Sequence, residues 1–184
     1  MAYVIDLETG DPNGILALLF AIASTRVKLI AVTLSPGTNE QVSLVRWILN
    51  HFDCNDVRIG AREWPNNANK IGYVSDKFYS KFGRSSDLSC DPADKVLLEC
   101  CNEEVTLVTS SPFFNLEKAL MNPVFKVGRL VAQGGFVSCN VIPATQERQH
   151  LKFLNKDVGR TDNFYRNTTG TKEVLESNRI GRRI

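Results

Sequence analysis

Short apolar segments typical of β-strands alternate along the chain with segments whose apolar residues have helical spacing. We expect strands at Tyr3–Ile5, Val27–Leu34, Val57–Gly60, Val105–Val108 and Val127–Ala132, and helices at Ile15–Ala23, Glu40–Phe52, Asp94–Cys101 and Phe114–Met121. Such alternation is typical of β-α-β units, in which helices cover both faces of a parallel sheet. The sequence therefore predicts an α/β fold with a Rossmann-like, open and mostly parallel sheet.

The composition favours a single domain and excludes several classes of function. The chain has 184 residues, of which 43% are hydrophobic, so that a sizeable core is expected. Its net charge of +2 does not indicate binding to nucleic acid or to a membrane surface. No secretory signal is recognised, and the five cysteines lack metal-binding or disulfide spacing. We therefore expect a cytoplasmic protein with free thiols.

Two long stretches interrupt the alternation of strands and helices. Trp64–Pro92 and Phe136–Gly170 are rich in polar and aromatic residues and have no clean period. Each is too long for an ordinary connection between a strand and a helix. We interpret both as functional or lid-like insertions.

The turn after the first predicted strand carries the most informative polar residues. Asp6, Glu8 and Asp11 lie within six positions, and Asn13 follows them. Ligands of open α/β sheets bind at the carboxyl ends of the strands, and a hard cation would relieve the repulsion between such acids. In a structural interpretation, Asp11 caps the following helix and Pro12 is its first residue. Both interpretations of this turn remain open.

Several segments together resemble a known family. Asp6–Leu19 resembles the amino-terminal signature of the inosine/uridine-preferring nucleoside hydrolases, and Leu29–Gly37, Val105–Leu120 and Leu130–Gly135 resemble later segments of that family in the same order. Asp162–Phe164 lies where the family has an asparagine that contacts ribose. The resemblance implies that residues 1–184 form one nucleoside hydrolase-like α/β domain without the family's carboxyl-terminal part.

The resemblance also implies a chemistry, the hydrolysis of the N-glycosidic bond of ribonucleosides with the help of Ca²⁺. Asp6, Glu8 and the backbone carbonyl of Ser110 are the implied metal ligands, and Glu8 is the implied catalytic base. Asn13 and Asn163 are the implied contacts to a nucleoside or another ribose-containing small molecule.

The sequence departs from the family pattern at the metal site. Neutral Asn13 and Gly14 stand where the family has two adjacent acids, which removes two negative charges from a Ca²⁺ site. The only histidines, His51 and His150, lie outside the family's late His-Asp motif, and the family's chain continues beyond Ile184. Hydrolysis is therefore expected to be impaired.

Two alternatives to an impaired hydrolase remain. One is a noncatalytic pseudoenzyme that acts as a binding or assembly subunit, with a protein partner or as a homo-oligomer. The other is a piece of a longer enzyme, whose open sheet edge would need a partner. Three arginines in Arg179–Arg183 are typical of a solvated terminus or of a surface for an acidic partner or RNA.

Overall fold

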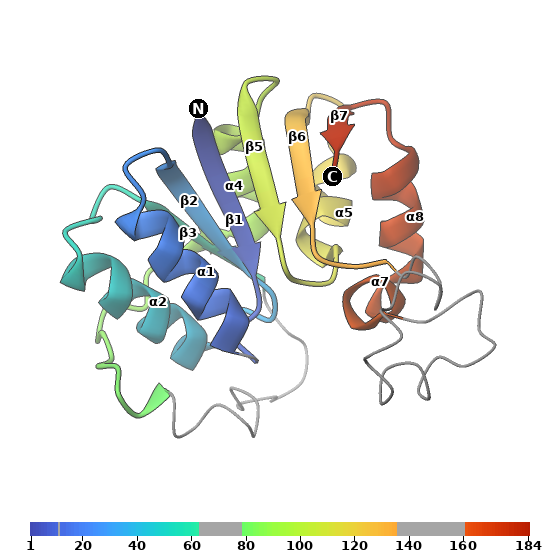
Figure 1. Cartoon of the computed structure of the whole chain (residues 1–184). Coiled ribbons are helices and arrows are strands. Elements are labelled where there is room, and N and C mark those ends of the chain that lie inside the picture. Colours follow the sequence, from blue (N-terminus) through green and yellow to red (C-terminus); the bar gives the residue numbers. More distant parts are fainter. Residues whose placement is uncertain (11, 63–78, 136–160) are drawn as a thin grey trace, which may run out of the picture.

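The computed structural model describes residues 1–10, 12–62, 79–135 and 161–184. Seven strands form one sheet in the order β4-β3-β2-β1-β5-β6-β7, and its strand pairs are all parallel (Figure 1). The strands are β1 (Ala2–Leu7), β2 (Lys28–Leu34), β3 (Arg58–Ala61), β4 (Asp91–Pro92), β5 (Val105–Thr109), β6 (Val127–Ala132) and β7 (Ile180–Arg183). The helices are α1 (Pro12–Ala23), α2 (Asn39–His51), α4 (Ala93–Cys100), α5 (Phe114–Leu120), α7 (Asp162–Arg166) and α8 (Thr168–Glu176). The predicted α/β fold with an open parallel sheet is confirmed.

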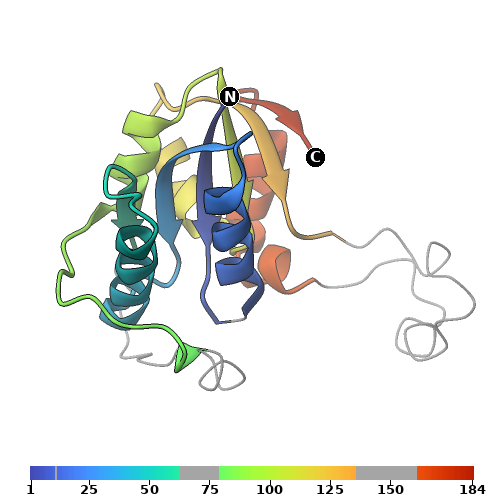
Figure 2. The same cartoon turned by 60° about the vertical axis from the view of Figure 1, so that its left-hand side comes forward.

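Helices cover both faces of the sheet, as predicted. In Figures 1 and 2, α1 and α2 lie on one face, while α4, α5 and α8 lie on the other. Successive residues of a strand point to opposite faces, so Val4 packs in the core beside α4 and α5, whereas Ile5 packs beneath α1 and α2. Both side chains are at most 5% exposed. The sheet thus separates two apolar cores, and its strand ends are left for polar loops.

Helix α2, predicted over Glu40–Phe52, begins at Asn39 and is capped by Thr38. The backbone amide of Gln41 donates to Thr38 Oγ1 at 3.3 Å, and the Thr38 amide donates to Gln41 Oε1 at 3.0 Å. This reciprocal pair is a capping box, which satisfies amides that have no partner inside the helix. The predicted cap of α1, Asp11, lies outside the described residues.

Four elements were not predicted from the sequence. The stretch Trp64–Pro92 ends in β4, and Phe136–Gly170 ends in α7 and the start of α8. Residues 63–78 and 136–160, which include the first part of each stretch and His150, lie outside the described residues. The basic segment 179–183 contains β7, because Ile180 is buried in the core and the Arg179 guanidinium donates to backbone oxygens at the end of α5.

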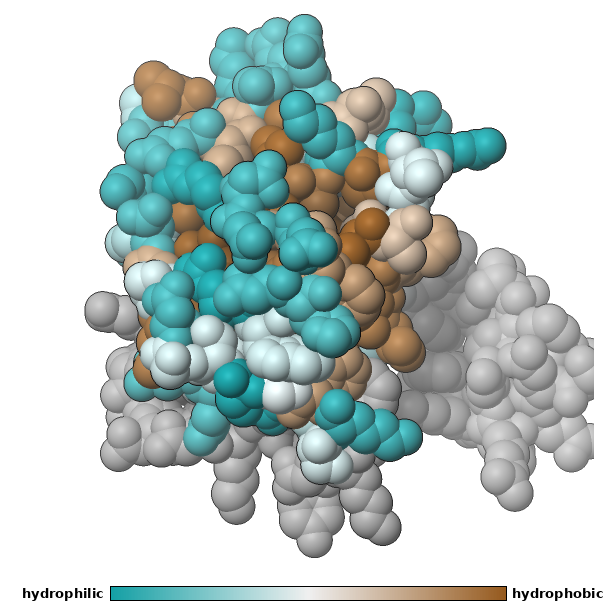
Figure 3. Space-filling view, turned by 90° about the vertical axis from the view of Figure 1, so that its left-hand side faces the viewer, coloured by the Kyte–Doolittle hydropathy of each residue, from teal (hydrophilic) through white to brown (hydrophobic). Residues whose placement is uncertain are grey.

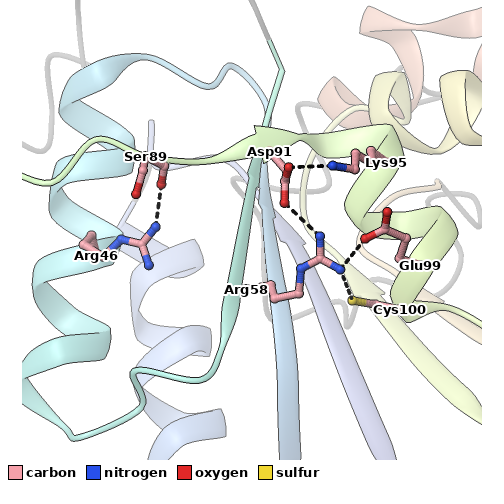
Figure 4. A network of polar contacts seen from close by, with 7 residues as sticks. All are labelled: Arg46, Arg58, Ser89, Asp91, Lys95, Glu99 and Cys100. Atoms are coloured by element: carbon pink, nitrogen blue, oxygen red, sulfur yellow. Dashed lines mark hydrogen bonds and ion pairs between the residues drawn. The ribbon is translucent and has the colours of Figure 1, made fainter.

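An ionic network holds the short strand β4 at one edge of the sheet (Figure 4). Arg58 at the start of β3 contacts Asp91 at 2.8 Å and Glu99 of α4 at 2.6 Å. Lys95 lies 3.0 Å from the second oxygen of Asp91. The network therefore ties β3, β4 and α4 together at this edge of the sheet.

Apolar side chains also reach the surface. Helix α1 has no charged residue, and its Leu16 and Phe20 are 54% and 75% exposed. Figure 3 shows apolar residues gathered toward the right of its view, beside a largely polar surface.

Within the described part of the chain, every helix is too short or too polar to cross a membrane.

Candidate functional site

A cavity of about 390 Å³ opens at the carboxyl ends of β1, β5 and β6. It brings together four residues that the sequence analysis selected, namely Glu8, Asn13, Ser110 and Asn163. Its other lining residues are Gln133, Gly134, Gly135, Thr161 and Asp162. Because β1 lies beside β5 and β5 beside β6, residues more than a hundred positions apart meet here. The remaining selected residue, Asp6, does not line this cavity.

Asp6 is instead fully buried beneath the site, where four side chains donate hydrogen bonds to it. Oδ1 accepts from Thr33 and from Asn115, both at 2.7 Å. Oδ2 accepts from Thr109 at 3.1 Å and from the Ser111 hydroxyl. Burial raises the pKa of the Asp6 carboxyl, and the four hydrogen bonds oppose this rise. Both oxygens are occupied by donors from β2, β5 and α5, so Asp6 ties these elements to β1.

Gly14 stands where the resemblance would place a second acid, and the packing explains why it is a glycine. A Cβ at this position would lie well inside 3.0 Å of the backbone oxygen of Glu8. Any side chain at residue 14 would therefore displace the turn that carries Glu8. The neighbouring Asn13 accepts a hydrogen bond from the Gly14 amide at 2.8 Å through Oδ1. The residues that replace the acid pair thus belong to the local structure of the turn.

Asn163 connects α7 to two of the strand ends. Its Nδ2 donates to the backbone oxygen of Ser110 at 3.1 Å and to that of Gln133 at 2.9 Å. Gly134 leaves space for the Phe164 ring, since a Cβ at residue 134 would collide with that ring. These contacts hold Asn163 in the wall of the cavity, between the ends of β5 and β6.

Sequence reasoning did not select Gln133, Thr161 or Asp162. Gln133 lies within the segment Leu130–Gly135 that carried part of the resemblance, so a signal for it was present. Thr161 accepts a hydrogen bond from the Gly135 amide at 3.1 Å, and Gly135 has a φ of 84°, which favours glycine. The glycine pair therefore shapes the cavity wall between β6 and α7.

The described residues do not fit the Ca²⁺ ion that the resemblance implies. Ca²⁺ takes six to eight oxygen ligands, usually including several carboxylates. No group of three or more His, Cys, Asp or Glu residues capable of holding a metal occurs in the described part of the chain. Of the two acids among the described residues of the cavity wall, Asp162 forms an ion pair with Arg166 at 2.9 Å. Asp11 lies outside the described residues.

Solved structures of nucleoside hydrolases have a similar fold. The inosine-uridine preferring nucleoside hydrolase from Bacillus anthracis has a TM-score of 0.67 and 21% identity, over 98% of this chain and 63% of its own. A plant nucleoside hydrolase has a TM-score of 0.57 and 20% identity, over 73% and 48%. The type III effector protein XopQ, in a complex with adenosine diphosphate ribose, has a TM-score of 0.53 and 15% identity, over 73% and 43%.

This chain therefore spans between 43% and 63% of the length of these three structures. No protein-family model matches the sequence, and no curated protein matches it. The likeness is one of fold, and it agrees with the family that the sequence resembles.

Proposed function

We propose that this chain, which has the nucleoside hydrolase fold, binds a ribonucleoside or a related ribosyl compound in the cavity beside Glu8, and that its hydrolytic activity is impaired. The observation that carries the binding proposal is the convergence of Glu8, Asn13, Ser110 and Asn163 on one cavity. Support also comes from the fold neighbours, two of which are named as nucleoside hydrolases and a third of which is described with a bound ribosyl compound.

Glu8 is the residue best placed to act on a bound ribonucleoside. In hydrolysis, a water oxygen would bond to C1′ as the bond from C1′ to the base nitrogen breaks. The water proton would pass to the Glu8 carboxylate, and the base nitrogen would take a proton from solvent. A positioned general base contributes about 10²- to 10⁴-fold to such a reaction. Glu8 is half-buried in the cavity wall, which suits this role.

A noncatalytic role as a binding or assembly subunit is the second candidate. The packing of Gly14 against the Glu8 carbonyl favours it, because the turn has no room for a second acid. A protein partner or a second copy would find an apolar surface at Leu16 and Phe20 of α1. We place either role in the cytoplasm.

Isothermal titration with inosine and with uridine, combined with an assay of released ribose, tests the proposal. Binding of either nucleoside to the wild-type chain, with slow release of ribose, is the expected result. Glu8→Gln should retain binding within about threefold and should abolish any release that the wild type shows. Asn50→Ala, an exposed change on α2, serves as the control.

The possible results separate the two candidates. Release of ribose that depends on Glu8 would establish hydrolase activity and exclude the noncatalytic role. Binding without release would support the noncatalytic subunit. An absence of binding at millimolar nucleoside would overturn the proposal as a whole.

A further inference from the structure

We infer that the cavity recognises the two ribose hydroxyls through the side-chain amides of Gln133 and Asn163, so that ligand binding does not depend on Ca²⁺. This inference rests on the proposed function, since it names the chemistry of the same site. It departs from the metal-dependent chemistry that the resemblance implies.

The orientation of the Asn163 amide is fixed by its surroundings. Nδ2 faces two backbone carbonyl oxygens, those of Ser110 and Gln133, and donates to both. If Oδ1 occupied that position, it would repel both carbonyl oxygens. The hydrogen bonds therefore decide which end of the Asn163 amide is Nδ2 and which is Oδ1. Oδ1 then has no hydrogen-bond donor among the residues that the structure describes, and Asn163 lines the cavity. It provides a hydrogen-bond acceptor for a ligand.

Gln133 supplies the complementary donor. Its backbone amide donates to the Thr109 oxygen at 2.9 Å, which fixes the residue at the end of β6. Its Oε1 accepts a long hydrogen bond of 3.5 Å from Asn13, and Nε2 has no partner within the described ranges. The Gln133 backbone oxygen contacts Asn163 directly, so the donor and the acceptor belong to neighbouring residues of one cavity wall. A hydroxyl group both donates and accepts, which suits this pair.

The charges of the cavity wall favour hydroxyl groups over a cation. Among the described residues that line it, Glu8 and Asp162 are the acids, and Asp162 is already paired with Arg166. Asp6 lies below the wall with all of its acceptor positions directed at protein donors. The affinity of a Ca²⁺ site falls as its charged ligands are removed, whereas hydrogen bonds from amides to hydroxyls need no net charge. Neutral amides therefore take the place that a cation would have.

The test compares inosine binding to the full chain in EDTA and in millimolar Ca²⁺, by isothermal titration. Equal dissociation constants, within about twofold, are expected, and 2′,3′-dideoxyinosine should bind about tenfold more weakly than inosine in both buffers. Binding of inosine in Ca²⁺ alone would overturn this inference and leave the proposed function intact. Binding in neither buffer would instead reject the proposed function.

Two variants of the exposed residue Gln133 test whether its side chain recognises the ribose hydroxyls. Gln133→Ala should weaken inosine binding about three- to tenfold and leave 2′,3′-dideoxyinosine binding unchanged, because only the former ligand has the hydroxyls. Gln133→Glu keeps the size of the side chain but removes the donor, and should weaken inosine binding similarly in EDTA and in Ca²⁺. Asn50→Ala should change neither ligand. Inosine affinity that is unaffected by Gln133→Ala, or that Ca²⁺ restores in Gln133→Glu, would contradict the inference.

Discussion

The carboxylate of Asp6 accepts a buried hydrogen bond of 2.7 Å from the side-chain amide of Asn115, which joins the end of β1 to α5. Asn115 also donates to the backbone oxygen of Leu34 at 3.2 Å, so that β2 is held by the same amide. Both side chains are at most 2% exposed. The acid that the resemblance assigns to a metal site thus has a structural role beneath the cavity.

Asp6→Asn should lower the free energy of unfolding by about 2–4 kcal/mol. An amide at this position replaces one acceptor oxygen with a donor, so that buried donors lose their partner. Urea unfolding followed by circular dichroism measures the change. The exposed Asp56→Asn is the matched control and should stay within about 0.5 kcal/mol of the wild type. Equal unfolding midpoints for wild type and Asp6→Asn would refute the structural role.

Gly14→Ala should destabilise the fold by about 1–3 kcal/mol, because a Cβ would collide with a backbone atom that cannot rotate away. Gly10→Ala provides the comparison in the same turn, since a Cβ there would lie 3.6 Å from Glu8 Oε1, an ordinary contact. Thermal unfolding of both variants measures the difference. A Gly14→Ala protein as stable as Gly10→Ala would show that the turn has more room than the structure indicates.

Stability in acid should depend on Asp91. Hydrogen bonds from Arg58 and Lys95 lower the pKa of this carboxyl below its ordinary value of 3.8. Its stabilising contribution is therefore present above pH 3.8 and is lost as the pH falls through the lower pKa of the folded state. Wild type and Asp91→Asn should differ in stability near neutral pH and converge in acid. A difference that grows in acid, or that high salt leaves unchanged, would contradict this prediction.

The cysteines should differ in their reactivity. Burial raises the pKa of the Cys101 thiol to about 12. Partial burial also raises the pKa of the Cys90 thiol, but Cys90 is exposed at the surface, so reagents reach it. Iodoacetamide reacts with the thiolate, so it should modify Cys90 in the folded protein and Cys101 only after unfolding. Peptide mass spectrometry after timed labelling measures both rates. Equal rates in the native state would indicate that the end of α4 opens readily.

The strongly periodic elements could be predicted from the sequence, whereas the polar edge elements could not. The strand at Val127–Ala132 was predicted with the bounds that the structure has, because it is largely apolar and the glycine pair Gly134-Gly135 follows shortly after it. Strand β7 contains Ile180 followed by glycine and two arginines, and β4 has only two residues. Neither has the alternation on which a sequence prediction depends. Their positions are set by pairing with β6 and β3.

The candidate site, like the fold, could be predicted from the sequence only in part. The loops that form the cavity follow from the strand order. Glu8 and Asn13 were singled out from the polar turn after the first strand, and Ser110 and Asn163 were found through the resemblance. The burial of Asp6 could not be predicted, because its donors come from segments that are distant in sequence and have no common motif. The predicted catalytic role of Glu8 and the ligand roles of Asn13 and Asn163 remain predictions.

The central position of β1 has a consequence for the order of folding. On one side Ala2 pairs with Lys28, and on the other it pairs with Val105. The first pairing can form soon after synthesis of β2. The second must wait for about 75 residues more, and closing so large a loop is slow. Until β5 arrives, β1 is an unprotected edge, and the donors at residues 109, 111 and 115 that satisfy Asp6 are missing. The nascent chain therefore has a long period in which its amino-terminal half is prone to mispairing.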